Sequence, residues 1–260
     1  MHTKYLGFLL AIGVPAAALC AGSAPGAAGV SDVSDVSTSV APAAHSAGAL
    51  ASLLEQQAPQ LNPQVLDLAL SAVSCAQSSG VAPEAQRLAV IDYSRSSLTP
   101  RLWVFDLSSQ RLLYHEVVAH GQGSGGDTPN RFSNQDSSHA SSLGLFVTRD
   151  TYIGHNGLSL RMEGLEQGIN DAAMARAIVM HGAAYVNPAV DQGMGRLGRS
   201  WGCPALRAAV AKPIIDVMKN GQFVFSYYPD QAWLAHSALL KCAAARQRLA
   251  ATTEQKNGKV

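Results

Sequence analysis

The sequence predicts a mainly β domain, built as a curled β-sandwich and flanked by helices at its N- and C-terminal ends. Two observations predict this fold. Between residues 87 and 228 the chain contains short segments rich in apolar or β-prone residues, separated by clusters of Gly, Ser, Asn and Pro. On either side, alanine-rich stretches carry apolar residues at helical spacing. A β core with helices packed against it accommodates both patterns.

Composition excludes some functions. The chain has 260 residues, a formal net charge of +1 and 47% hydrophobic residues, which allows one sizeable core. The charge is balanced, and no basic stripe with interleaved aromatic residues occurs. We therefore expect no nucleic-acid partner.

Residues 1–24 have the organisation of a secretory signal peptide. His2 and Lys4 precede an apolar run over residues 5–19, and small residues follow. The run is shorter than the ~20 residues of a membrane-spanning helix, so we expect cleavage near residues 18–24 and no stable membrane span afterwards. Lipidation of Cys20 is an alternative that the bulky Leu19 disfavours. We expect an exported protein of the periplasm or cell envelope.

The rest of the chain divides into four parts. Residues 25–49 are almost all Ala, Ser, Gly, Val, Asp and Pro, which predicts a flexible tether. Residues 50–86 predict a helical segment with a cap at Asn62 and Pro63. The β domain covers residues 87–230, and residues 231–260 predict a closing helix (Trp233 to Leu249) and a polar tail. The expected strands are Leu88–Asp92, Leu102–Leu107, Leu112–Ala119, Leu143–Thr148, Leu158–Met162, Ala177–Met180 and Phe223–Tyr228.

Three cysteines remain if Cys20 leaves with the signal peptide. In an oxidising compartment an odd count leaves one thiol unpaired. Cys75 and Cys242 lie in the helix-like segments that flank the β domain, so they are candidate disulfide partners. The alternative is that both are small buried hydrophobic residues. Cys203 is left over in either case.

The strongest candidate site lies between residues 178 and 206. A short strand is expected to end at His181 and Gly182, and a later loop reads Ser200-Trp201-Gly202-Cys203-Pro204. An adjacent imidazole activates a thiol by taking its proton and holding the thiolate as an ion pair. A glycine beside the thiol lets a substrate backbone approach closely. A buried cysteine and a core histidine that meet by chance are the alternative.

Pro204 adds two expectations. Proline suits the first position of a helix, so we expect Cys203 to cap a short helix over Ala205–Ala211, whose positive end favours the thiolate. Because proline has no N–H, an oxyanion hole must use the N–H of Cys203, Gly202 or an earlier residue.

A metal site is a competing interpretation. His120 and Asp127 have the H-x6-D spacing of some zinc peptidases, but neither H-x-H nor E-x-x-H occurs to complete the ligand set. We therefore expect no metal and no cofactor.

The pair His181-Gly182 and the loop Ser200-Trp201-Gly202-Cys203 resemble the murein L,D-transpeptidase catalytic domain family, which is YkuD-like. The S-x-G-C-P loop is similar to that of a divergent branch. Blocks at residues 118–126, 132–134, 141–144 and 159–161 extend the resemblance over about residues 87–228. The resemblance implies a β-rich catalytic domain over residues 87–230 that acts on peptidoglycan stem peptides.

The resemblance also implies a reaction. Cys203 would attack the carbonyl of a donor stem before a D-residue, and the D-residue would leave. An amine of an acceptor stem would then resolve the thioester, which forms a crosslink or exchanges the terminal D-residue. His181 would serve as the base, the Gly182 carbonyl would orient its imidazole, and Ser200 would position the loop. An L,D-carboxypeptidase that uses the same pair and a non-catalytic peptidoglycan-binding domain are the alternatives.

This chain departs from the family at two positions. The commoner loop has His where Trp201 stands, and Arg or Asn where Ala205 stands. Trp201 offers a stacking or packing surface instead. The other candidate substrate-binding residues are Arg199, Tyr152, His155 and Arg161, for each of which a purely structural role is the alternative.

Overall fold

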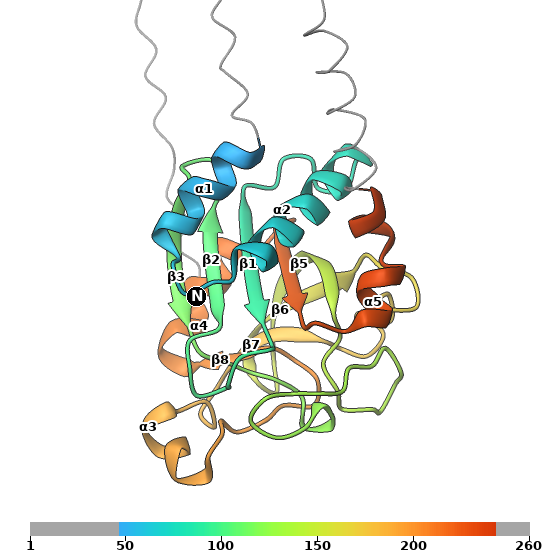
Figure 1. Ribbon diagram of the computed structural model, residues 1–260. Helices are drawn as coiled ribbons and strands as arrows, with labels where there is room; N and C mark the ends of the chain where they lie inside the picture. The colour runs from blue at the N-terminus through green and yellow to red at the C-terminus, as the bar shows by residue number, and fades with distance from the viewer. Residues whose placement is uncertain (1–46, 243–260) are drawn as a thin grey trace, which may run out of the picture. The chain divides into compact units, whose positions relative to one another are not determined.

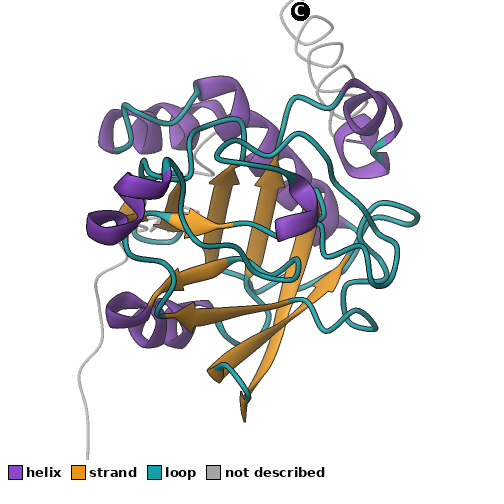
Figure 2. Ribbon diagram, turned by 90° about the horizontal axis from the view of Figure 1, so that it is seen from below, coloured by secondary structure: helices purple, strands orange, loops and turns teal. Residues whose placement is uncertain are grey.

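The computed structural model describes residues 47–242. Within these residues nine strands form one mixed sheet in the order β3-β2-β1-β9-β5-β6-β7-β8-β4, which curls strongly (Figure 2). The prediction of a mainly β fold with flanking helices is confirmed. The expected signal peptide, most of the tether and the polar tail lie outside the described residues. The strands are β1 (Arg87–Asp92), β2 (Leu102–Asp106), β3 (Arg111–Glu116), β4 (Val118–Ala119), β5 (Gly144–Gly154), β6 (Gly157–Gly164), β7 (Val179–Ala183), β8 (Ala205–Arg207) and β9 (Phe223–Tyr227).

Helices cover both sides of the sheet (Figures 1 and 2). Helix α2 (Pro63–Ser78) packs on β1, β5 and β9, whereas α4 (Ala208–Met218) packs on β1, β6, β7 and β8. The predicted cap of α2 is present, because the side chain of Asn62 accepts the N–H of Gln64 and proline follows it in the first turn. Helix α1 (Ala47–Gln57) begins inside the segment expected to be a tether, so that boundary was wrong by a few residues.

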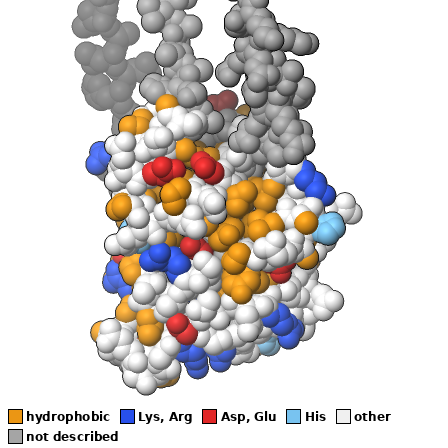
Figure 3. Space-filling model, viewed as in Figure 1, with side chains coloured by type: hydrophobic (Ala, Val, Ile, Leu, Met, Phe, Trp, Pro, Cys, Tyr) orange, Lys and Arg blue, Asp and Glu red, His pale blue; other side chains and the backbone are white. Residues whose placement is uncertain are grey.

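The core lies between the sheet and these helices. Strand β2 is buried at every position and β1 at all but its first, which explains why both read as continuous apolar runs. The predicted bounds of β1, β2 and β9 agree with the structure within one residue at each end, whereas β5 continues to Gly154, six residues beyond its predicted end. At the edge of the core, hydrophobic side chains gather between α2 and α5 (Gln231–His236) on the face drawn in Figure 3.

Three predicted elements need correction. Residues Ala205–Arg207 form strand β8 and not the first turn of a helix, which starts only at Ala208. Strand β7 continues through Ala183, so His181 lies inside the strand. The expected single closing helix is interrupted at Ser237, after α5. A short helix α3 (Pro188–Asp191) and the 3-10 turns η1 (Gln122–Ser124) and η2 (Gln192–Met194) lie in the long loops.

A disulfide joins the two ends of the described chain. Cys75 in α2 is bonded to Cys242, 167 positions later in the sequence, with their Cα atoms 6.2 Å apart. The cysteines could have been disulfide partners or small buried hydrophobic residues, and the structure confirms the disulfide. None of the helices between residues 47 and 242 combines the length and the apolar character needed to span a bilayer.

Candidate active site

Neighbouring strands carry His181 and the chain that follows Cys203. Strands β7 and β8 pair in parallel, with His181 opposite Ala205. The N–H of His181 also lies 3.4 Å from the carbonyl of Pro204. This pairing therefore brings together the two ends of the long loop between His181 and Cys203.

The sheet register places other candidates on the face of His181. Tyr152 is opposite Ser159, and Ser159 is opposite His181, so the three side chains share one face. Arg161 follows Ser159 by two residues and shares this face, with its guanidinium carbon 4.3 Å from the centroid of the Tyr152 ring. It also pairs with Asp150. His155 lies at the exposed tip of the β5–β6 hairpin.

Gly182 has two structural consequences. A side chain there would meet helix α4, because an added Cβ would lie 2.8 Å from the Cβ of Ala211. The carbonyl of Gly182 is 3.0 Å from Nδ1 of His181, and Nδ1 donates to it in the tautomer that carries its proton there. This contact fixes the ring and leaves Nε2 to accept a proton.

The Cys203 thiol is buried and bonded to the backbone. Its Sγ lies 3.4 Å from the N–H of Val179, which donates to it, and 3.7 Å from the carbonyl of Ala177. Among the described residues no hydrogen bond joins Sγ to the His181 imidazole. Burial raises the pKa of the Cys203 thiol and lowers the pKa of His181. Both shifts favour the neutral thiol and the neutral imidazole over the expected thiolate–imidazolium ion pair. No helix begins at Cys203 to favour the thiolate.

Ser200 shapes the loop that carries the thiol. Its hydroxyl donates to the carbonyl of Cys203 at 2.6 Å and accepts the N–H of Gly202 at 3.1 Å. Gly202 has a φ of +118°, and a Cβ there would lie 2.9 Å from the carbonyl oxygen of Ala140. Since the N–H of Gly202 is occupied, the N–H of Cys203, which has no partner in the described part of the chain, is a donor on this loop that is available to an oxyanion.

Sequence reasoning missed Ser141, whose side chain supports the loop that carries Cys203. Its hydroxyl donates to the carbonyl of Gly202 at 3.0 Å and accepts the N–H of Gly121 at 3.0 Å. Its own N–H donates to the hydroxyl of Ser124 at 2.9 Å. Serines are too common to single out from one sequence, although Ser141 and Ser124 both fall in blocks that carry the family resemblance.

Arg176 was also missed. Its guanidinium donates to the carbonyls of Ser133 and Ala140, each at 2.7 Å, and to the hydroxyl of Ser142 at 2.7 Å. These contacts hold the loop 133–142 against Gly202. The positive charge also lies close enough to the Cys203 thiol to lower its pKa, against the larger effect of burial. No motif in the sequence marks this arginine.

The remaining loop candidates have different surroundings. Trp201 is exposed, and its ring stacks on the imidazole of His139. Arg199 donates to the carbonyl of Gly125 at 2.6 Å and braces the loop 121–126. Trp201 is therefore open to solvent two positions before Cys203, whereas the Arg199 guanidinium is partly used by a backbone contact.

The two residues of the zinc-peptidase spacing have other partners. Nδ1 of His120 lies 2.8 Å from the guanidinium of Arg101, which is a cation. Asp127 accepts hydrogen bonds from the N–H and hydroxyl of Ser97 at 2.9 and 2.6 Å. Burial, and secondarily Arg101, lower the pKa of His120 to about 4. The two side chains thus have separate partners, and no hydrogen bond joins them among the described residues.

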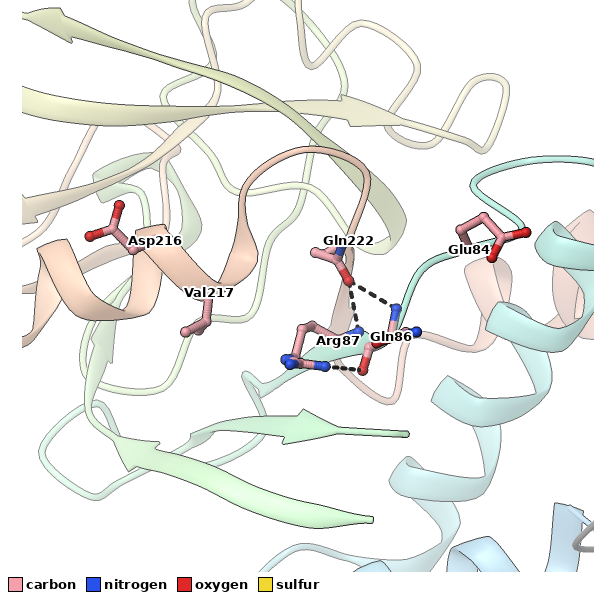
Figure 4. A pocket seen from close by; sticks show the side chains of 6 residues that line it. All are labelled: Glu84, Gln86, Arg87, Asp216, Val217 and Gln222. Carbon is pink, nitrogen blue, oxygen red and sulfur yellow. Dashed lines mark hydrogen bonds between the residues drawn. The ribbon is translucent and has the colours of Figure 1, made fainter. Parts of the chain in front are cut away.

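A separate pocket of about 360 Å³ lies where β1 and β9 begin (Figure 4). Its lining includes Arg87, Asp216 and Gln222. The side-chain oxygen of Gln222 accepts the N–H groups of Gln86 and Arg87 at 3.0 and 2.8 Å. None of the sequence-predicted site residues lines this pocket, so the candidate active site is the region around Cys203.

Comparison with solved structures yields weak global matches, among them three L,D-transpeptidases. One from Mycobacterium smegmatis is 14% identical, with a TM-score of 0.34, over 55% of this chain and 59% of that chain. LdtMt1 in complex with imipenem is 13% identical, with a TM-score of 0.33 and the same coverage. One from Stackebrandtia nassauensis is 13% identical, with a TM-score of 0.32, over 71% of this chain and 78% of that chain. This chain thus spans less than two thirds of the first two proteins.

A search of curated proteins found no match. The model of the L,D-transpeptidase catalytic domain matches residues 57–227, which is more than half of the chain and includes His181 and Cys203. The chain therefore belongs to the L,D-transpeptidase catalytic domain family.

Proposed function

We propose that this protein is a peptidoglycan L,D-transpeptidase that works through a thioester on Cys203. One observation carries the proposal. Between residues 47 and 242 Cys203 is the one free cysteine, and it lies on a braced loop beside the strand that presents His181. The other two cysteines of this range form the disulfide. We further propose that the protein acts in the periplasm or cell envelope, where its substrate lies.

The first half-reaction transfers the donor stem to the enzyme. Nε2 of His181 takes the thiol proton as Sγ bonds to the carbonyl carbon of the residue before the D-residue. The N–H of Cys203 stabilises the resulting oxyanion. The C–N bond then breaks, and His181 returns the proton to the departing amine. Because catalytic hydrogen bonds are often long in the free enzyme, the Sγ–imidazole contact forms when the substrate binds.

The second half-reaction releases the product. An amine of the acceptor stem attacks the thioester, His181 takes a proton from that amine, and the C–S bond breaks. The proton then returns to Sγ. Water in place of the amine gives the carboxypeptidase reaction with the same residues. The crosslink and the exchange of a terminal D-residue differ only in the amine that enters.

Intact mass after incubation with a carbapenem tests the proposal. The complex of LdtMt1 with imipenem makes this compound class a suitable acylating probe. We expect one covalent adduct on the wild type and none on Cys203→Ala, with both proteins folded. Muropeptide products then separate transfer from hydrolysis. A full adduct on Cys203→Ala would contradict the proposed nucleophile.

A further inference from the structure

Trp201 differs from the other two tryptophans of the chain. Its side chain is 70% exposed, whereas Trp103 and Trp233 are at most 3% exposed. It lies two residues before the nucleophile proposed above. A large exposed aromatic ring at such a position offers a flat apolar surface to a ligand. We infer that Trp201 and His139 form a platform on which a pyranose ring of the glycan strand stacks while its stem peptide reacts at Cys203. This inference rests on the proposed function.

The two rings of the platform are already stacked on each other without a ligand. The rings of Trp201 and His139 are nearly parallel, 3° apart, with centroids separated by 4.8 Å. The side-chain amide of Gln122 donates to Nδ1 of His139 at 3.0 Å. His139 itself has a φ of +51°, a left-handed conformation that non-glycine residues rarely adopt. Strained backbone of this kind is typical of functional sites.

The platform is also fixed relative to the thiol. Ser200 ties the residues on both sides of Trp201 together by bonding the N–H of Gly202 and the carbonyl of Cys203. On the His139 side, Arg176 holds the neighbouring residues Ser138 and Ala140 at 3.1 and 2.7 Å. These contacts restrain the backbone next to both rings.

The chemistry of the platform selects an uncharged ring. One face of the Trp201 indole is covered by His139, and the large exposed fraction leaves area for a second flat surface. A pyranose ring has a face of C–H groups that can cover an indole, with hydroxyls directed outward to water. Removing these two surfaces from water is favourable without any charged partner. A stem peptide of the expected kind has no aromatic ring to occupy the same place.

The distances are consistent with this assignment. The Cα atoms of Trp201 and Cys203 are at most about 7 Å apart, because the two residues are two positions apart in the sequence. In a tetrapeptide donor whose fourth residue leaves, three stem residues lie between the attacked carbonyl and the sugar, and in extended form they span about 10 Å. The length of the indole side chain is comparable to the difference between these two distances. A donor bound at Cys203 can therefore place its sugar on Trp201.

Two substrates test the inference: a disaccharide–tetrapeptide and the same tetrapeptide without sugar. For Trp201→Ala we expect the KM of the disaccharide–peptide to rise about tenfold, equivalent to about 1.4 kcal/mol, with the KM of the bare peptide unchanged. Trp201→Phe should retain most of the preference. Met194→Ala, which removes another exposed hydrophobic side chain, is the control and should change neither. Equal losses on both substrates, or no loss on either, would overturn the inference.

Fluorescence tests the platform even if the proposed function fails. No turnover of either substrate by the wild type would argue against the function alone. Since the other tryptophans are buried, iodide quenching reports on Trp201. We expect a soluble trimer of N-acetylglucosamine to protect wild-type fluorescence from iodide and to have no such effect on Trp201→Phe. Quenching that saturating trisaccharide leaves unchanged in the wild type would refute the sugar platform.

Discussion

The guanidinium of Arg101 lies 2.8 Å from Nδ1 of His120, and both side chains are buried. The carbonyl of the same histidine accepts the N–H of Ser200 at 3.0 Å, so this contact supports the nucleophile loop from inside the domain. Because Arg101 donates to Nδ1, the imidazole must be neutral. The folded state therefore resists protonation of His120.

This arrangement predicts a loss of stability in acid. The pKa of His120 falls from an ordinary 6.5 to about 4 on folding, so only the unfolded chain binds the proton between these values. The neutral His120 therefore contributes about 3 kcal/mol to the free energy of unfolding above pH 6.5. This contribution is lost as the pH falls toward 4. Urea unfolding at several pH values measures this loss.

His120→Asn is the matched variant, because its side-chain oxygen can replace Nδ1 as an acceptor but does not titrate. Between pH 7 and 4 it should lose about 3 kcal/mol less stability than the wild type. Burial also lowers the pKa values of His115 and His181, and their contributions cancel in the comparison. Parallel pH curves for the two proteins would show that His120 does not titrate as expected.

The reactivity of Cys203 should increase across the alkaline range. Burial raises the pKa of its thiol, and only the thiolate reacts. The alkylation rate with iodoacetamide should therefore rise about tenfold per pH unit from pH 7 to 9. The absorbance of the thiolate at 240 nm, measured against Cys203→Ser, should follow the same curve. A rate that is already constant at pH 6–7 would instead indicate a preformed ion pair.

Gly202→Ala should damage the nucleophile loop. Its φ of +118° is strained for alanine, and the new Cβ would lie 2.8 Å from Ile178 Cδ1. We expect a loss of about 1–3 kcal/mol in the free energy of unfolding and much slower carbapenem acylation. Gly193→Ala is the control, since nothing lies within 4 Å of its added Cβ. If both variants acylate at the wild-type rate, the loop geometry is not needed for reaction.

The disulfide should contribute to stability and leave the chemistry unchanged. The bond between Cys75 and Cys242 closes a long loop and lowers the entropy of the unfolded chain. Replacing both residues by serine should reduce the free energy of unfolding by about 2–4 kcal/mol. Acylation of the folded protein at 25 °C should be unaffected. Slower acylation of a fully folded double variant would reveal a role beyond stability.

The sequence predicts the elements whose local signals agree with their surroundings. Asn62 and Pro63 mark the start of α2, and the apolar runs mark β1 and β2. Strand β8 was missed because Pro204 is a strong local signal for a helix start, whereas pairing with β7 and β4 decides the outcome. That pairing involves residues distant in sequence, which local propensity does not contain.

The sequence predicts part of the candidate site, as it predicts part of the fold. Cys203, His181 and Gly182 come from one short stretch and were identified together. Ser141 and Arg176 act on the same loop from other parts of the chain, through contacts that only the fold creates. The neutral state of the thiol also depends on burial, which the sequence does not reveal.

Because β7 pairs in parallel with β8, the relative position of His181 and Cys203 does not depend on the length of the loop between them. His181 is held by the sheet register, and Cys203 by Ser200 and Ser141. The turn over Gln192–Met194 has no buried residue, and a side chain added at Gly193 or Gly195 would meet open space. This turn is therefore a permissive insertion point, where a tag or a reporter domain can be built into the chain without moving the residues that react.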